Sequence, residues 1–400
     1  MNDQILAKAA AFAGTSCYVF DLDMLKERIT YLRTHLPEDV ALCYAVKANP
    51  FLAGALDPVV DRLEICSPGE LAICNRLHCT SGNYVISGVY KTPEVMHDQF
   101  YRSGNEIYTV ESLAQYERLK EIALSAEKPM RLLIRLTSGN QFGLAKHDLE
   151  AVLVDAMQEP LLHVLGLQFF SGTQKTSIKR LKKELSELDA YLAELKERFG
   201  YEAEELEYGA GLPVSYFQRD AYDEDAHLAG VSEALNAMTF AGKITLELGR
   251  AIAASCGTYL TKVVDEKTID GQKFAITDGG IHQLTYYGQF MAMKHPYVHL
   301  LTPHHGAQEE EWTIFGSLCT INDILIKRIP FAGLRTGDIL AFERAGAYCV
   351  TEGIALFLSR DLPAVVLYEN GALTLARNNT PTDGLNTPGD APLTIASETR

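Results

Sequence analysis

The octapeptide CYAVKANP, residues 43–50, places one lysine, Lys47, between a short apolar strand and an Asn-Pro pair that begins a loop. A lysine at the end of a buried strand points into a cavity, where desolvation disfavours its charged form. A neutral amine is what Schiff-base chemistry with a carbonyl group requires. On these eight residues alone, an ordinary lysine that extends to solvent is an equally good interpretation.

Apolar runs like the one before Lys47 recur up to residue 250, and amphipathic stretches separate them. The eight runs are VALCYAV at 40–46, LEIC at 63–66, YVIS at 84–87, IYTV at 107–110, RLLIRL at 131–136, HVLGLQFF at 163–170, LEY at 206–208 and ITLEL at 244–248. Eight short strands joined by helical connections predict a (β/α)₈ barrel rather than an open sheet. The clearest helix is 178–199, where apolar residues recur at helical spacing up to Gly200.

The character of the chain changes after Arg250, where strand-like segments follow one another with turns and without helices. These segments predict an all-β second domain, so the fold class is α/β plus all-β. The run CYVF at 17–20 is a surplus ninth strand, and we expect it to pair with the second domain. The predicted domains are a barrel at 21–250, a β-domain made of 1–20 and 251–376, and a mobile tail at 377–400 that is rich in turn-forming residues.

The composition excludes several classes of protein. The 400 residues are 47% hydrophobic and carry a net charge of −16, which argues against nucleic acid or an anionic membrane as a partner. No run of 18 apolar residues and no secretory signal pattern is present, so we expect a cytoplasmic protein. Eight cysteines without a CxxC pair fit a reducing compartment. No metal site is predicted, because His304 and His305 lack spaced partner ligands.

The candidate functional residues follow the ends of the predicted strands, where the active sites of such barrels lie. Lys47 follows the first strand, SGTQ at 171–174 follows the sixth, GAG at 209–211 follows the seventh, and ELGR at 247–250 ends the eighth. Small residues let backbone amides approach a phosphate closely, and Gly249 with Arg250 adds further donors. A lone GAG is usually a turn, but at this strand of a barrel it indicates a phosphate site.

Glu247 has two interpretations, which are evenly matched on sequence alone. It is either part of a stabilising ion pair or the partner of a buried base. If the cofactor is pyridoxal 5′-phosphate (PLP), a carboxylate at the pyridine nitrogen keeps that nitrogen protonated and makes the ring a stronger electron sink. The second interpretation favours carbanion chemistry.

With these positions assembled, the chain resembles the fold type III PLP-dependent decarboxylases, the family of diaminopimelate, ornithine and arginine decarboxylases. These enzymes pair an alanine-racemase-like (β/α)₈ barrel with a C-terminal β-domain. The resemblance spans roughly residues 15–370, and its ordered set of motifs is specific although each motif is weak alone. The motifs are YAVKAN around Lys47, SPGEL at 67–71, QFG at 141–143, SGTQ, GAG, ELGR, TDGG at 277–280, GSLCTIND at 316–323, GD at 337–338 and GAY at 346–348.

The resemblance implies that Lys47 forms the Schiff base with PLP and that Glu247 contacts the pyridine nitrogen. The other implied cofactor contacts are Phe170, Thr173, Gly209, Ala210, Gly211, Gly249, Arg250 and Tyr348. Cys319 and Asp323 would reach the active site of the neighbouring subunit, so the functional unit would be a homodimer with shared active sites. Cys319 would give a proton to the decarboxylated carbon. From the residues alone, Cys319 is equally a buried filler and Tyr348 a core tyrosine.

Four positions depart from the best-known members of this family. Phe170 stands where a histidine usually stacks on the cofactor ring, and Ala210 replaces the middle glycine of the phosphate loop. Thr320 replaces an acidic residue that reads the distal ammonium of the substrate. Tyr286 takes the place of an arginine that binds a distal carboxylate in diaminopimelate decarboxylase.

These departures shape the expected substrate. Without the acid at Thr320, free lysine or ornithine would leave its ammonium poorly matched. The Cys-Thr pair after GSL, the SGTQ motif, and DGG followed by His282 resemble relatives that decarboxylate an amino-acid unit on a larger molecule, such as a carrier-protein thioester or a citryl conjugate in siderophore biosynthesis. We therefore expect a decarboxylase of a conjugated substrate, which contacts Thr320, Asp323, Tyr286 and His282.

Three alternatives stay open. The first is a decarboxylase of free diaminopimelate, lysine or ornithine. The second is an amino-acid racemase, a branch that typically has arginine in place of Glu247. The third is a noncatalytic binding protein with the PLP-enzyme fold.

Overall fold

The computed structural model describes residues 1–79, 84–220 and 222–389, and the chain divides into two compact units. The barrel unit comprises Leu22–Ser215 and Asp220–Cys256. The β unit comprises Met1–Asp21, Tyr216–Arg219 and the chain from Gly257 onward. The sequence predicts divisions after residues 20 and 250, and it does not predict that 216–219 join the β unit.

Eight parallel strands close into a barrel in sequence order, as predicted, with the first strand hydrogen-bonded to the last. Seven of the eight are buried along most of their length, because side chains on one face fill the barrel and those on the other meet the helices. The strands are β2 (Ala41–Ala45), β3 (Arg62–Ile65), β4 (Tyr84–Ile86), β5 (Ile107–Val110), β6 (Met130–Leu136), β7 (Leu162–Phe170), β8 (Glu205–Gly209) and β9 (Lys243–Leu248).

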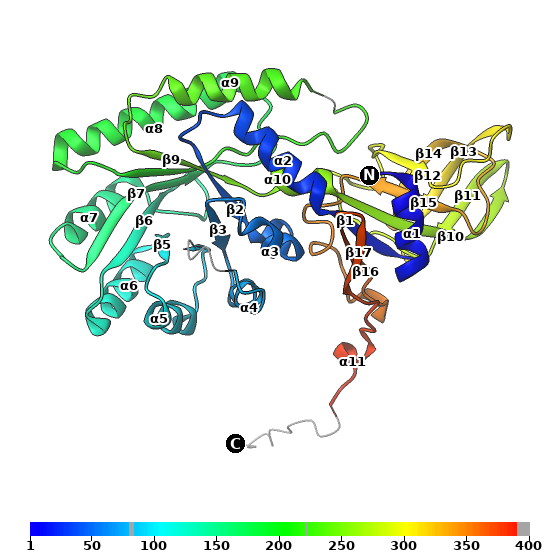
Figure 1. Ribbon diagram of the computed structural model, residues 1–400, viewed down its shortest axis with the longest axis horizontal. Helices are drawn as coiled ribbons and strands as arrows, with labels where there is room; N and C mark the ends of the chain where they lie inside the picture. Colours follow the sequence, from blue (N-terminus) through cyan, green and yellow to red (C-terminus); the bar gives the residue numbers. More distant parts are fainter. Residues whose placement is uncertain (80–83, 221, 390–400) are drawn as a thin grey trace, which may run out of the picture. The chain divides into compact units, whose positions relative to one another are not determined.

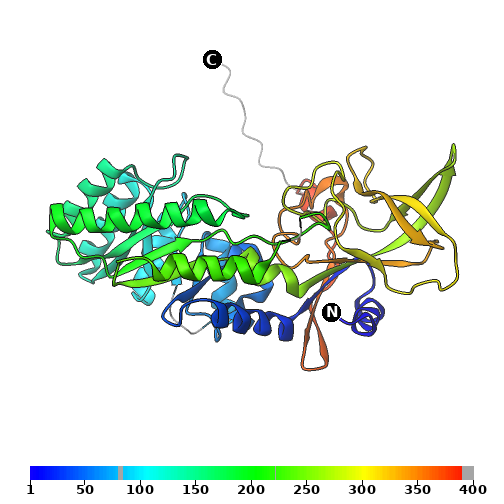
Figure 2. The ribbon, with the colours of Figure 1, turned by 90° about the horizontal axis from the view of Figure 1, so that it is seen from above.

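Helices connect these strands and lie outside the barrel (Figure 1). They are α2 (Leu22–His35), α3 (Ala53–Leu56), α4 (Pro68–Arg76), α5 (Pro93–Arg102), α6 (Leu113–Ala126), α7 (Lys146–Ala156), α8 (Ile178–Phe199), α9 (Glu224–Asn236) and α10 (Arg250–Ala253), with the 3₁₀ turns η1 (Val46–Ala48), η2 (Pro50–Leu52) and η3 (Ala254–Cys256). Helix α8 is the clearest predicted helix. The side chain of Ser177 caps its first turn, Gly200 ends it at φ +66°, and its leucine face is buried. It packs beside α9 (Figure 2).

The β unit is built on a nine-stranded sheet, with the path β14-β13-β11-β10-β1-β16-β17 and with β15 joining β10 to β12. Its elements are α1 (Asp3–Ala13), β1 (Cys17–Asp21), β10 (Gly257–Ile269), β11 (Gln272–Thr277), β12 (Val298–Leu300), β13 (Glu309–Phe315), β14 (Ile324–Ala332), β15 (Ile339–Glu343), η4 (Phe357–Ser359), β16 (Ala364–Glu369), β17 (Ala372–Arg377) and α11 (Asp383–Asn386). The surplus strand β1 pairs with β10 and β16, which confirms its predicted place.

Two parts of the β unit differ from a simple all-β expectation. The helix α1 was not predicted; Asn2 caps it, and its buried residues Leu6, Ala9 and Ala10 pack on the sheet core. The predicted tail begins at residue 377, but Thr380 pairs with Leu362 and the buried Thr382 hydroxyl donates to the Arg360 carbonyl. Residues 390–400 of that tail lie outside the described part of the chain. Among the described helices, none is both long and apolar enough to cross a bilayer.

Candidate active site

Lys47 lies in η1, directly after β2, at the carboxyl end of the barrel. Its Nζ donates to Oε2 of Glu64 at 2.6 Å and lies 3.5 Å from Oε1 of Glu247. The Sγ of Cys66 is 3.6 Å from the same nitrogen. The lysine side chain is 39% exposed whereas that of Glu64 is 2% exposed. The amine is therefore partly exposed and lies against two carboxylates, whereas the sequence predicts a cavity in which desolvation disfavours its charge.

A third buried carboxylate lies deeper in the barrel. Glu207 on β8 accepts a hydrogen bond from Nε2 of Gln168 at 2.7 Å, and the same amide lies 3.3 Å from Oε2 of Glu247. Burial raises the pKa of Glu207, and repulsion from Glu247 raises it further. Burial and repulsion from Glu64 likewise raise the pKa of Glu247. Gln168 thus bridges two carboxyl groups that cannot both ionise easily.

Glu64 behaves differently from these two residues. Burial alone would raise its pKa, but the charge and the hydrogen bond of Lys47 outweigh burial and lower it. The site therefore holds one ionised carboxylate against the lysine and, behind it, a carboxyl group at Glu247 that retains its proton more readily. Such a proton-bearing acid fits a basic ring nitrogen, which is the role that the sequence predicts for Glu247.

The loops after β7 and β8 lie in contact, and the glycines there are required by close packing. A Cβ on Gly209 would lie 2.4 Å from the ring of Phe170. A Cβ on Gly211, which has φ +61°, would lie 2.2 Å from the carbonyl oxygen of Gly172. Ala210 between them is fully buried. Backbone without side chains at the end of these strands forms a cradle of the kind that accepts a phosphate.

A network of polar side chains, which we call the loop clamp, fixes these two loops to each other. Gln174 exchanges two hydrogen bonds with the backbone of Val214, at 2.9 and 2.6 Å. The amide of Lys175 donates to the carbonyl of Gly211 at 2.9 Å, and its Nζ lies 2.6 Å from Glu184 and 3.3 Å from the carbonyl of Gly209. The clamp consists of Gln174, Lys175 and Glu184.

The remaining predicted cofactor residues of the barrel unit lie at the same end. Thr173 belongs to the loop after β7, and Gly249 follows β9. Arg250 begins α10 and is 8% exposed. Together with the cradle and the carboxyl group of Glu247, these residues fit a cofactor that carries both a ring nitrogen and a phosphate.

The sequence did not single out a second charged group at this end of the barrel. Arg135 donates to Glu111 at 3.0 Å, and the buried Nζ of Lys91 donates to the carbonyl of Gly88 at 2.8 Å. Burial lowers the pKa of Lys91 to about 8. Glu64, Gln168 and Glu207 were missed as well. The available signal was a polar residue inside an otherwise apolar strand, as in LEIC, LGLQFF and LEY.

In the β unit, Cys319 is exposed on the loop between β13 and β14. Asp323 holds this loop, because its carboxylate accepts the amides of Ile281 at 2.8 Å and Leu318 at 2.7 Å and is 1% exposed. Thr320 and Leu318 line a groove of about 300 Å³ with the aromatic rings of Phe274 and Phe315. The Asp323 carboxylate is engaged by backbone of its own loop and of the segment after β11, so its contact with substrate stays a prediction.

Three further predicted residues also belong to the β unit. Tyr286 is 7% exposed, and its hydroxyl donates to the carbonyl of Glu343 at 2.6 Å. Tyr348 is half-buried with φ +67°. His282 is 2% exposed, and neither ring nitrogen has a hydrogen-bond partner among the described residues. Tyr286 is packed and satisfied within its own unit, so its contact with substrate stays a prediction, as do the roles of the other two.

Comparison with known proteins agrees with this geometry. A family model described as "Pyridoxal-dependent decarboxylase, C-terminal sheet domain" matches residues 17–346. An L-glutamyl-[BtrI acyl-carrier protein] decarboxylase of Niallia circulans is 25% identical over 93% of this chain and 92% of its own length. A 2-[(L-alanin-3-ylcarbamoyl)methyl]-2-hydroxybutanedioate decarboxylase of Staphylococcus aureus is 25% identical over 87% and 93% of the two chains. A diaminopimelate decarboxylase of Aquifex aeolicus is 28% identical over 93% and 91%.

Solved structures show the same architecture. The crystal structure of diaminopimelate decarboxylase from M. jannaschii superposes with a TM-score of 0.84 at 22% identity, covering 94% of this chain and 92% of that one. The closed parallel barrel, the sheet domain and the matched family model agree over most of the chain. This chain belongs to the family of pyridoxal-dependent decarboxylases, and its cofactor is PLP.

Proposed function

We propose that this decarboxylase removes the α-carboxylate of an amino-acid unit that is part of a larger molecule, such as a citryl intermediate or an amino acid on a carrier protein. The proposal rests on the side chains that surround Thr320. This residue lines an open groove together with mostly apolar side chains. The carboxylate of Asp323, in the same groove, already accepts two backbone amides. The groove therefore offers little to a free distal ammonium but leaves room for an attached group.

Each residue near Lys47 has a chemical role in this proposal. PLP, when bound, supplies an electron sink for the electron pair that remains after carbon dioxide leaves. Lys47 would hold the cofactor, and Glu64, 2.6 Å from the lysine Nζ, would take up or return the proton of that amine. Glu247 keeps the ring nitrogen protonated, and Gln168 fixes the orientation of the Glu247 carboxyl group.

The phosphate-holding part of the site comes from the cradle at Gly209, Ala210 and Gly211, and from Gly249 and Arg250, which follow the neighbouring strand β9. Phe170 packs directly on Gly209, so its ring is fixed at the rim of this cradle. Cys319 is exposed, as a residue that reaches a second subunit must be. We assign it the protonation of the product carbon in a homodimer with shared active sites.

Two relatives support a conjugated substrate. The Niallia circulans and Staphylococcus aureus proteins are named for decarboxylation of a carrier-linked glutamyl group and of a carboxylate-rich conjugate. Diaminopimelate decarboxylases at similar identity favour the alternative, a free amino acid. Sequence identity does not distinguish a conjugated substrate from a free amino acid, so the preference for a conjugated substrate rests on the groove beside Thr320.

The test is release of carbon dioxide by the PLP-loaded protein from a panel of free and conjugated amino acids. The free members are lysine, ornithine and diaminopimelate, and the conjugated members are citryl and carrier-linked amino acids. We expect release from a conjugated member at a kcat/KM far above that of any free one. Comparable or faster release from a free amino acid would contradict the proposal while leaving the decarboxylase assignment intact.

A further inference from the structure

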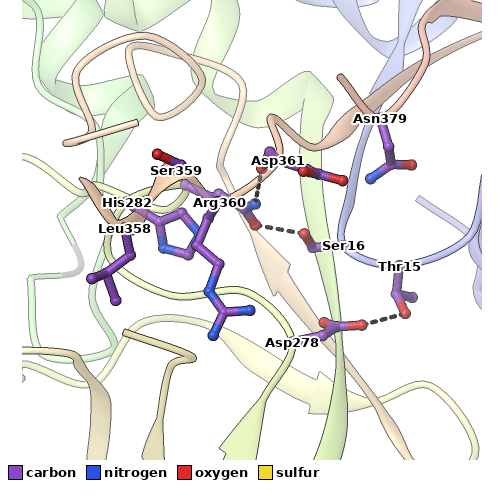
Figure 3. A pocket seen from close by; sticks show the side chains of 10 residues that line it. Thr15, Ser16, Asp278, His282, Leu358, Ser359, Arg360, Asp361 and Asn379 are labelled. Carbon is purple, nitrogen blue, oxygen red and sulfur yellow. Dashed lines mark hydrogen bonds between the residues drawn. The ribbon is translucent and has the colours of Figure 1, made fainter. Parts of the chain in front are cut away.

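A polar pocket of about 600 Å³ lies within the β unit (Figure 3). Its walls come from four parts of the chain: residues 15–16, 278–283, 358–361 and Asn379. Every lining residue except Leu358 is polar. The pocket shares no residue with the group around Lys47, and the decarboxylase chemistry gives it no task.

The imidazole of His282 is the least satisfied group in this pocket. The residue is 2% exposed, and neither Nδ1 nor Nε2 has a partner among the described residues. Burial and the nearby charge of Arg360 lower the pKa of His282 to about 4, so the ring is neutral at pH 7. Protein atoms cover both nitrogens almost completely, so the ring forms part of the pocket wall and does not offer a hydrogen bond to a ligand. Its position beside Arg360 makes it a reporter for that guanidinium.

Several other polar groups of the pocket are already engaged and shape its wall. The carboxylate of Asp278 accepts the hydroxyl of Thr15 at 2.6 Å and that of Thr261 at 2.7 Å. The side chain of Gln283 accepts the hydroxyl of Ser16 at 2.5 Å and donates to the carbonyl of Asp361 at 3.0 Å. These groups have little capacity left for a ligand.

Two charged side chains of the pocket keep unused capacity. Arg360 is exposed and spends one Nη2 hydrogen on the carbonyl of Ser317 at 2.9 Å, which leaves most of its five N–H donors. Asp361 is exposed, and no hydrogen bond or ion pair of its carboxylate occurs within the described residues. The guanidinium of Arg360 lies near the His282 ring, whereas the Asp361 carboxylate lies apart from it (Figure 3). One cationic end and one anionic end therefore face the same space.

We propose that this pocket binds a small zwitterionic amino acid, with its carboxylate on Arg360 and its ammonium toward Asp361. An arginine fork suits a carboxylate, and the Asp361 carboxylate suits an ammonium. Asp361 would repel a ligand that carries only a negative charge, and Arg360 would repel a ligand that carries only a positive charge. The pocket is a second ligand site, and His282 lies in its wall.

The experiment uses the PLP-loaded protein with N,N-dimethylglycine as probe, because its tertiary amine cannot form a Schiff base with the cofactor. Histidines carry ¹³C at Cε1, and His282→Gln identifies the His282 signal. We expect a saturable shift of that signal with N,N-dimethylglycine. Acetate, which has only the carboxylate, should bind at least about tenfold more weakly, since it lacks one charge-assisted contact.

Three variants complete the test. Arg360→Gln and Asp361→Asn should each weaken the probe by about tenfold or more. Arg328→Gln removes an exposed arginine that pairs with Glu311 outside the pocket, and it should leave the affinity unchanged. If Arg360→Gln lowers the melting temperature, the affinity of Asp361→Asn provides the test instead. The Asp361 carboxylate makes no hydrogen bond or ion pair within the described residues, so its loss should not disturb the fold. A wild-type signal without saturable shift, equal binding of acetate, or full affinity in Asp361→Asn would overturn the proposal.

Discussion

Glu207 is fully buried in the barrel, and its nearest polar partner is the amide of Gln168. Its raised pKa means that the native protein binds this proton more tightly than the unfolded chain does. The stability from this group is therefore complete below the ordinary carboxyl pKa of about 4.3 and is lost as the pH rises through the native pKa. A carboxyl group at this buried position therefore lowers the free energy of unfolding as the pH rises and the group ionises.

Replacing Glu207 with glutamine should stabilise the cofactor-free protein as the pH rises. Between the unfolded and the native pKa, the free energy of unfolding of the wild type should fall relative to the variant by up to about 1.4 kcal/mol per pH unit. Urea unfolding followed by circular dichroism at several pH values measures this difference. Glu187→Gln, an exposed residue of α8, is the control. A difference that does not change with pH would contradict the assigned pKa direction.

Thr320 is the residue on which substrate choice depends. Thr320→Glu should raise kcat/KM for a free diamino acid by about tenfold, because the new carboxylate pairs with the distal ammonium. Thr320→Gln keeps nearly the same size without the charge and should have no such effect. If the two variants behave alike, or neither changes kcat/KM, the groove beside Thr320 does not receive the distal end of the substrate.

At the scale of elements, the loop clamp connects the segment after β7 to the segment after β8 and to α8. Glu184 on α8 accepts hydrogen bonds from Lys175 and from the hydroxyl of Tyr208, both at about 2.5 to 2.6 Å. Burial lowers the pKa of Lys175, and the ion pair with Glu184 opposes that effect. Through Glu184, the helix thus holds the loop side chain that contacts the carbonyl of Gly209 in the cradle.

Lys175→Met should weaken PLP binding by about tenfold, because it removes the charge-assisted contact that holds the two loops together. The dissociation constant of PLP, measured by absorbance titration of the apoenzyme, gives the readout. Lys183→Met removes an exposed α8 lysine that pairs with Glu187 on the same helix, and it should leave the constant unchanged. Equal constants in all three proteins would show that the clamp does not set cradle geometry.

The elements themselves were largely predictable. The barrel strands that contain IYTV and ITLEL are short, mainly apolar runs, and α8 shows a leucine stripe between Ser177 and Gly200. The position of Lys47 after β2 follows from the same pattern. Its contact with Glu64 does not, because that contact arises only when β2 and β3 pair in one register within a closed barrel. Helix α1 was missed because the short segment 3–13 is alanine-rich and its burial depends on the sheet below.

At the scale of the whole molecule, the proposal of shared active sites predicts complementation between inactive subunits. Lys47→Ala and Cys319→Ala should each have little activity as homodimers. Random pairing makes half of the dimers mixed, and each mixed dimer holds one intact site, so co-expression should restore about one quarter of wild-type activity. Carbon dioxide release from the purified mixture measures it. Activity no higher than that of the separate variants would place both residues in the site of one subunit.

The central claim is that Lys47 holds the cofactor at the mouth of the barrel, against Glu64 and Glu247. Borohydride reduction of the PLP-loaded protein makes the lysine–cofactor bond permanent, and peptide mass spectrometry then locates it. We expect the phosphopyridoxyl group on the peptide that contains Lys47, and no labelling in Lys47→Ala. Two buried amines, Lys91 and Lys175, are the competing positions, because burial lowers the pKa of both. Label on either of them, with Lys47 unmodified, would contradict the account of this site.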